Sequence, residues 1–184
     1  MVAKLKYDLH ATGAWLLLLI VAITVIMLGG CGDTAPASDG DIERVTIGDR
    51  SFNLELAMVR ESRRRGLGGR ESLPDDGGMF FVFPDAQLRR FWMFDCVISI
   101  DIAFIDPIGY VTAVHTMPPE ELRAENESLM EYEARLPGYS SAYPAQFAIE
   151  LPPGSFESLG IKAGDRIPIP PERLKMLGRA AEPD

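Results

Sequence analysis

The sequence predicts a mainly β fold with a few short helices (α+β), built as one compact domain of the antiparallel β-barrel-like or sandwich type. Apolar and polar residues alternate with a period of two over much of the chain after residue 42, as strands with one covered face require. Glycine, proline and aspartate separate the apolar runs and mark turns between them. The 184 residues, 47% apolar and 24% charged, suffice for one ordinary globular domain.

The first half of this domain is expected to contain a hairpin, a short helix and a buried strand. Apolar residues alternate on both sides of Gly48-Asp49, which predicts a hairpin over residues 45–58. A short helical turn follows at 61–65. The run 79–83 is apolar throughout and stops at Pro84, so it predicts a strand buried on both faces. Residues 88–93 are a further candidate strand.

The second half contains another predicted hairpin and a long excursion. Two apolar runs flank a turn tetrapeptide beginning at Asp106, which predicts an antiparallel hairpin over 98–116. The polar, proline-interrupted segment 117–144 indicates a surface excursion that covers a cleft, with a short helix at 120–125. We further expect a strand at 145–151, a helical turn at 154–159 and a last strand at 166–169. Pro170-Pro171 is expected to end the fold, so the domain is assigned to residues 42–170. The tail at 171–184 is expected to be a loose amphipathic turn or disordered.

The first thirty residues have the pattern of an export signal. Two lysines precede an apolar run at 14–28, which is short for a membrane-spanning helix. The run ends in Leu28-Gly29-Gly30-Cys31, which resembles the bacterial lipobox. The resemblance implies that residues 1–30 are a signal peptide, that Cys31 is lipidated and that 31–41 form a flexible linker. The alternative is an uncleaved membrane helix ending at Gly30; either way the domain lies outside the cytoplasm.

The charge of the chain argues against one class of partner. The formal net charge is −9, and so acidic a domain repels phosphate backbones. We therefore expect no nucleic acid partner, and a membrane partner only through the lipid on Cys31. The sequence sets no oligomeric state.

Eight ordered segments between residues 65 and 166 resemble one known family, the domain of unknown function 192. They are Arg65-Gly66-Leu67, Leu73-Pro74, Gly78-Met79-Phe80-Phe81-Val82-Phe83-Pro84, Phe91-Trp92-Met93, Ile100-Asp101-Ile102-Ala103-Phe104-Ile105-Asp106, Met117-Pro118, Ala148-Ile149-Glu150-Leu151-Pro152 and Leu159-Gly160-Ile161-Lys162-Ala163-Gly164-Asp165-Arg166. The resemblance implies a compact, mainly β, often exported domain with no assigned reaction. Two segments depart from the usual pattern: Phe94-Asp95-Cys96 stands where the family has Lys-Asn-Thr, and Gly66-Leu67-Gly68 where it has Gly-Leu-Met.

Cysteine and histidine offer little chemistry in this chain. Lipidation of Cys31 leaves Cys96 unpaired, and we expect a buried, inert thiol there. The alternatives are a nucleophile pair with His115 and a disulfide with an unlipidated Cys31. His115 is expected to be a core or edge histidine, with a ligand or a catalytic base as the alternative. One histidine after residue 31, without CxxC or HExxH, predicts no metal site, and nothing in the sequence implies a cofactor.

Two carboxylates in apolar strands are stronger candidates than the turn residue Asp106. Alternation places Asp101 and Glu150 outward, toward solvent or a groove. Alternatives are ion pairs with Arg65, Arg89 or Arg90, or a ligand-binding or glycosidase-like role.

Trp92 is the remaining candidate. It offers a stacking platform for a sugar or another flat ligand, the alternative being a core aromatic. The predicted ligand-binding residues are therefore Arg65, Trp92, Asp101 and Glu150.

These observations favour an exported, membrane-anchored lipoprotein that binds a small ligand, for example a carbohydrate, and is not an enzyme. The ligand is expected in a groove near Trp92 and Asp101, under the 117–144 excursion. The first alternative is an envelope interaction or assembly factor, which would show an exposed apolar patch. The second is a hydrolase that uses Asp101 and Glu150, whose carboxyl groups must then face each other across one cleft.

Overall fold

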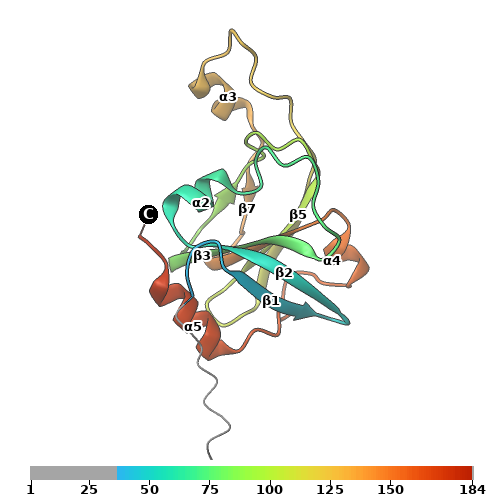
Figure 1. Cartoon of the computed structure of the whole chain (residues 1–184), viewed down its shortest axis with the longest axis vertical. Coiled ribbons are helices and arrows are strands. Elements are labelled where there is room, and N and C mark those ends of the chain that lie inside the picture. The colour runs from blue at the N-terminus through green and yellow to red at the C-terminus, as the bar shows by residue number, and fades with distance from the viewer. Residues whose placement is uncertain (1–36, 184) are drawn as a thin grey trace, which may run out of the picture. The chain divides into compact units, whose positions relative to one another are not determined.

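The computed structural model of the protein describes residues 37–183 (Figure 1). The predicted signal peptide, the lipidation site Cys31 and the first part of the predicted linker lie outside the described residues. Within 37–183, no helix is both long and apolar enough to cross a membrane.

The described chain is mainly β, as predicted. Its main sheet has six strands in the order β1-β2-β3-β8-β5-β6 and does not close into a barrel; a separate two-stranded sheet pairs β4 with β7. The bounds are β1 Ile42–Ile47, β2 Arg50–Ala57, β3 Gly77–Gln87, β4 Arg90–Phe91, β5 Ile100–Ile105, β6 Val111–Met117, β7 Tyr139–Ser140 and β8 Ala145–Leu151. The pair β2–β3 is parallel and the other pairs are antiparallel, so the sheet is mixed.

Four helices accompany the sheets: α2 Arg60–Arg65, α3 Leu129–Arg135, α4 Ser155–Ser158 and α5 Pro171–Ala180. The predicted turns at 61–65 and 154–159 are confirmed as α2 and α4. The helix predicted at 120–125 is wrong. The helix of this excursion begins after Ser128, where a capping box with Glu131 satisfies the first-turn donors. The strand predicted at 88–93 is present only as the two residues of β4. At the strand predicted for 166–169 there is only an isolated β-bridge between Tyr110 and Arg166.

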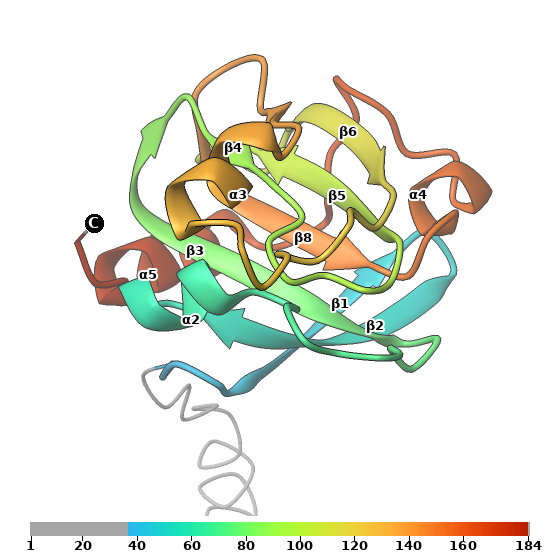
Figure 2. The ribbon, with the colours of Figure 1, turned by 90° about the horizontal axis from the view of Figure 1, so that it is seen from above.

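The main sheet separates two hydrophobic layers. Figures 1 and 2 show α5 on one side of the sheet and α2 and α3 on the other. Strands β3, β8 and β5 lie in the middle and are buried on both faces. Phe80 and Ile149 therefore face the layer that includes α5, whereas Phe81 and Ala148 face the other layer. The strand predicted at 79–83 is confirmed as doubly buried.

The C-terminal segment is a structural element, which corrects the prediction of a loose or disordered tail. In α5, Leu174 and Leu177 are fully buried against the sheet. Arg173 also forms an ion pair with Glu43 of β1 at 2.5 Å. The double proline suggested a chain end, but Pro171 occupies the first helical turn, where its missing N–H and fixed φ favour a helix.

Strand β1 begins at Ile42, the predicted start of the domain, and the end of the predicted flexible linker is held in place. The Asp39 carboxylate accepts hydrogen bonds from the Met58 amide at 2.7 Å and from the Ser62 hydroxyl at 2.6 Å. The Gly40 amide donates to the Leu56 carbonyl at 2.8 Å. The N-terminal segment is therefore fastened to β2 and α2 before the first strand begins.

Candidate functional site

A hollow of about 540 Å³ lies beside α2, on the side of the sheet away from α5. Its lining comes from α2, from β3, from the segment 88–96, from Glu133 of α3 and from Glu150 of β8. This volume falls within the ~300–1,000 Å³ range of small-molecule sites. Three of the four predicted ligand-binding residues, Arg65, Trp92 and Glu150, contribute to this lining.

Aromatic side chains form one wall of the hollow. Phe81 and Phe91 meet edge to face, with ring centroids 4.9 Å apart, and Phe91 meets Phe83 in the same way at 6.3 Å. Trp92 is 48% exposed, so it is not a core residue and offers a free indole surface. Trp92 therefore fits the predicted stacking platform, and the core alternative is wrong.

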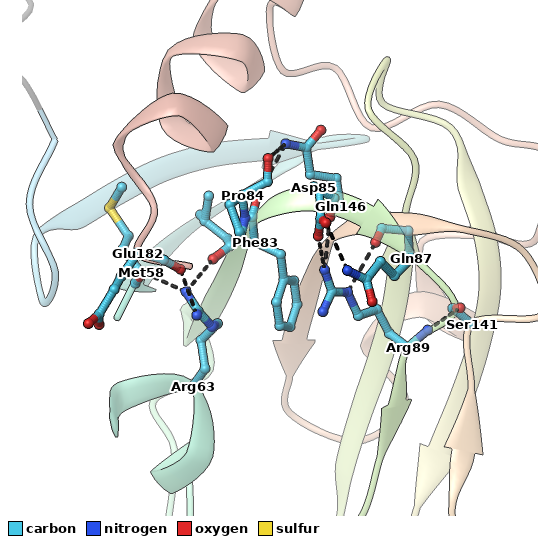
Figure 3. A network of polar contacts seen from close by, with 12 residues as sticks. Met58, Arg63, Phe83, Pro84, Asp85, Gln87, Arg89, Ser141, Gln146 and Glu182 are labelled. Carbon is cyan, nitrogen blue, oxygen red and sulfur yellow. Dashed lines mark hydrogen bonds and ion pairs between the residues drawn. The ribbon is translucent and has the colours of Figure 1, made fainter. Parts of the chain in front are cut away.

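Two arginines fix the aromatic wall by binding main-chain carbonyls (Figure 3). The Phe83 ring lies between the guanidinium groups of Arg63 and Arg89, whose central carbons are 5.2 Å and 3.9 Å from its centroid. Arg63 donates to the carbonyls of Met58, Val82 and Glu182. Arg89 donates to the carbonyl and the carboxylate of Asp85. These two side chains are structural parts of the site.

Four more arginines line the hollow, and their side chains are held by fewer contacts than those of Arg63 and Arg89: Arg60, Arg64, Arg65 and Arg90. All four are exposed. Arg64 lies 3.7 Å from Glu133 in a solvent-exposed ion pair, which contributes little to stability. Within residues 37–183, no salt bridge joins Arg60, Arg65 or Arg90 to an acidic group. The predicted ion pair of Glu150 or Asp101 with Arg65 or Arg90 is therefore wrong.

Glu150 lies in the centre of the sheet, which corrects its predicted outward position. Its side chain is 5% exposed and its Oε2 atom is buried without a hydrogen-bond partner among the described residues. Burial raises the pKa of Glu150 to about 8, with Arg70 opposing the shift. The group is therefore a neutral carboxylic acid near pH 7, with an O–H to donate. Alternation failed here because β8 has β3 and β5 as neighbours and is covered on both faces.

Asp101 is also buried rather than outward, and it does not reach the hollow. In the β5–β8 pairing Glu150 lies opposite Ile102 and Leu151 opposite Asp101, so the two acids point to opposite faces of the sheet. The Asp101 carboxylate accepts from Thr116 Oγ1 at 2.8 Å and from the Phe156 amide at 3.2 Å. Asp101 is a structural residue that joins β6 and α4 to β5. The prediction that it binds a ligand beside Trp92 is not supported by this placement.

Cys96 lines the hollow as a buried thiol, as predicted. Burial, together with Glu150 and Asp95, raises its pKa to about 12, so the reactive thiolate is scarce at neutral pH. His115 lies opposite Ile102 at the sheet edge, where its Nε2 is 2.8 Å from the Ser140 carbonyl oxygen and its ring meets Phe104 edge to face. His115 does not line the hollow. This arrangement confirms an edge histidine and gives no support to a nucleophile pair.

The excursion 117–144 supports the hollow through α3. Tyr132 is fully buried, and its ring packs against Phe94 in a tilted arrangement with centroids 5.2 Å apart. Its hydroxyl oxygen accepts from the Asp95 amide at 3.0 Å. Glu133, one residue further, lines the hollow. The helix therefore holds the segment 92–96 in place and contributes to the rim, in agreement with an excursion beside a cleft.

Sequence reasoning missed the arginine cluster. The signal was the run Arg60-Glu61-Ser62-Arg63-Arg64-Arg65, together with Arg89-Arg90, in a chain whose net charge is −9. Arg65, Arg89 and Arg90 were predicted only as single residues, and the net charge of the whole chain gives no sign of a local basic cluster in an acidic protein. Among residues 37–183, no group of three or more His, Cys, Asp and Glu could hold a metal ion.

The comparisons with known proteins agree with the fold. Residues 43–169 match the model of domain of unknown function 192, described as uncharacterized ACR, and the chain belongs to this family. The chain is similar to a crystal structure of a protein of unknown function from Novosphingobium aromaticivorans (26% identity, TM-score 0.58, covering 75% of this chain and 92% of that one). It is also similar to a "putative transcription regulator" from Sinorhizobium meliloti (26% identity, TM-score 0.52, covering 68% and 88%). A search of curated proteins found no match.

Proposed function

We propose that the protein is an extracytoplasmic lipoprotein, anchored through Cys31, whose domain binds one small molecule in the hollow beside α2. The observation that carries the proposal is the half-exposed Trp92 in the same lining as the buried, unpartnered Glu150. A flat ring can stack on the indole while a polar group of the ligand meets the buried acid. A sugar is one ligand with both features.

Binding is favoured over hydrolysis by the placement of the acids. A carboxylate-dependent hydrolase needs two carboxyl groups facing each other across one cleft. Asp101 and Glu150 point to opposite faces of the sheet, and Asp101 does not line the hollow. The high pKa of Cys96 likewise argues against a thiol nucleophile. Nothing in the hollow therefore assembles a nucleophile with a base.

The envelope interaction factor remains the second candidate because large apolar side chains are exposed near the hollow. Leu88, in its lining, is 69% exposed, and Met130 of α3 is 77% exposed. We do not propose a role in transcription, as the name of the Sinorhizobium protein suggests for that protein, because a net charge of −9 disfavours nucleic acid.

The binding proposal is tested by the thermal unfolding of the full chain in detergent with a panel of neutral and acidic sugars. We expect at least one sugar to raise the midpoint in the native sequence and not in Trp92→Ala. A panel without any shift would leave the interaction factor as the better explanation. The anchor is tested separately: Cys31→Ser should move the protein from the membrane fraction to the soluble fraction.

A further inference from the structure

We infer that the ligand of the hollow is an organic anion. Its acidic group is held by Arg65 and Arg90, one of its oxygens accepts a hydrogen bond from the protonated Glu150 carboxyl, and its flat body lies on Trp92. This inference rests on the proposed binding function and names the chemical class of the ligand. A carboxylate, sulfonate or phosphate monoester on a ring-bearing body satisfies it.

The local charge is opposite in sign to the charge of the protein. Six arginines line the hollow, against the two acids Glu133 and Glu150. Glu150 is neutral near pH 7, and Glu133 faces Arg64 across an exposed 3.7 Å gap. A concave surface with one sign of charge and apolar walls focuses the field and attracts the opposite charge. A cationic ligand is thereby disfavoured, and a neutral sugar would leave the charge uncompensated.

Arg65 and Arg90 are the arginines placed to bind the acidic group. Arg63 and Arg89 donate to main-chain carbonyls and to Asp85, and Arg64 faces Glu133. Arg60, Arg65 and Arg90 remain, and Arg60 lies at the start of α2, where its backbone amide donates to Glu182. Arg65 ends α2 and Arg90 lies in β4, two residues before Trp92, so these two line the hollow from different elements. A guanidinium presents a fork of donors that matches carboxylate, sulfonate or phosphate oxygens.

Glu150 supplies an independent sign of a ligand. A buried polar atom without a partner costs free energy, and such atoms concentrate at functional sites. Oε2 of Glu150 is such an atom. Glu150 is only 5% exposed, and it belongs to the lining of the hollow. A protonated carboxyl donates to a ligand oxygen, as buried neutral acids do in known sites. An ionised Glu150 would repel the same oxygen.

The test compares two fluorescent probes with one aromatic body, anilinonaphthalene sulfonate and uncharged N-phenyl-1-naphthylamine, in titrations of the full chain at pH 7. For the sulfonate, Arg65→Gln combined with Arg90→Gln should raise the Kd at least tenfold, while the Kd of the uncharged probe changes less than twofold. Trp92→Ala should weaken both probes. The control Arg44→Gln removes an exposed arginine of β1 that does not line the hollow, and should change neither Kd more than twofold.

A pH series isolates Glu150. The charged or titratable groups around it are Arg70, Cys96, Asp95, Glu133 and the arginines of the hollow. Cys96 and the arginines keep their charge states between pH 7 and 9, because the pKa of Cys96 is about 12 and arginine stays protonated. Sulfonate affinity should fall several-fold from pH 7 to 9 in the native chain. Glu150→Gln, which keeps a neutral donor, should bind at pH 7 and show no such fall.

The outcomes separate the two proposals. If both probes bind in a Trp92-dependent way but the arginine variants alter neither, the anion inference is overturned and the binding function stands. If Arg44→Gln weakens the sulfonate as much as the Arg65 and Arg90 changes, the effect is one of net charge and the inference is again overturned. If neither probe binds the native chain, both proposals fail.

Discussion

Replacing Glu150 with glutamine should change how the stability of the protein depends on pH. The carboxyl is buried, and its pKa is raised from the model-peptide value of 4.5 to about 8. Below pH 4.5 the folded and unfolded chains both hold the proton, so the free energy of unfolding does not change with pH through this group. Between pH 4.5 and 8 only the folded chain holds it, so the free energy of unfolding falls as pH rises.

The size of the fall follows from the two pKa values. At about 1.4 kcal/mol per pH unit, moving the pKa from 4.5 to about 8 lowers the free energy of unfolding by ~5 kcal/mol across this window. Above pH 8 both states are ionised and the loss levels off. Glutamine carries no titrating proton, so Glu150→Gln should resemble the native chain near pH 5 and exceed its stability by a few kcal/mol at pH 8 to 9.

Urea unfolding of the native chain and of Glu150→Gln at pH 5, 6, 7, 8 and 9 measures the difference in their free energies of unfolding at each pH. Glu133→Gln is the matched control, since this glutamate lines the same hollow but its side chain is 42% exposed. Its difference from the native chain should stay nearly constant with pH. Parallel curves for Glu150→Gln and the native chain would show that Glu150 titrates normally and would refute its burial as a neutral acid.

Three further predictions concern the parts that hold the hollow in place. Leu174→Ala should lower the free energy of unfolding by ~2–5 kcal/mol in urea, because Leu174 is fully buried in α5; a loss below ~0.5 kcal/mol would mean that α5 is not part of the core. Tyr132→Phe leaves the Asp95 amide without its acceptor and should cost ~1 kcal/mol, with faster proteolysis within residues 92–96 than in the native chain; unchanged proteolysis would contradict the anchoring role of α3. Cys96 should resist dithiobis(nitrobenzoate) at pH 8 until urea unfolds the chain, and rapid labelling of the folded protein would show an accessible thiolate.

Local patterns were sufficient to predict the elements whose neighbours in space are also neighbours in sequence. The hairpin β1–β2 follows from alternation around Gly48-Asp49, and the turn at Asp106 follows from its carboxylate, which accepts from the Ile108 and Tyr110 amides at 2.9 and 2.8 Å. The pairing of β3 with β2 and β8 joins distant segments, and no short-range pattern specifies it.

The failures share one physical cause. Asp101 and Glu150 were placed outward because polar residues alternate outward in a sheet with one wet face. Strands β5 and β8 have no wet face, since one hydrophobic layer covers each side. In such strands a lone acid is buried whichever way it points, and its partners decide its role. Asp101 has hydrogen-bond donors from Thr116 and Phe156, whereas Glu150 has an oxygen without one.

Three of the four site candidates line the same hollow, and whether they bind a ligand stays a prediction. Trp92, Arg65 and Glu150 come from three separate elements and still line one hollow. Their residue types made them candidates in the sequence. Only the register of the sheet shows that Glu150 faces the hollow and that Asp101 faces the opposite side. The arginine cluster was readable in the sequence and was hidden by averaging charge over the whole chain.

Two costs to the free molecule are relieved together when an anion binds. Six of the 18 Lys and Arg residues line one hollow, where like charges repel, and a neutral acid there cannot offset them. Under the proposed binding, an anion supplies the missing charge and accepts a hydrogen bond from the protonated Glu150 carboxyl. Because this site exists only in the folded state, the anion should stabilise that state by mass action. Because that proton leaves near pH 8 in the free protein, the stabilisation should be largest below this pH and decline above it.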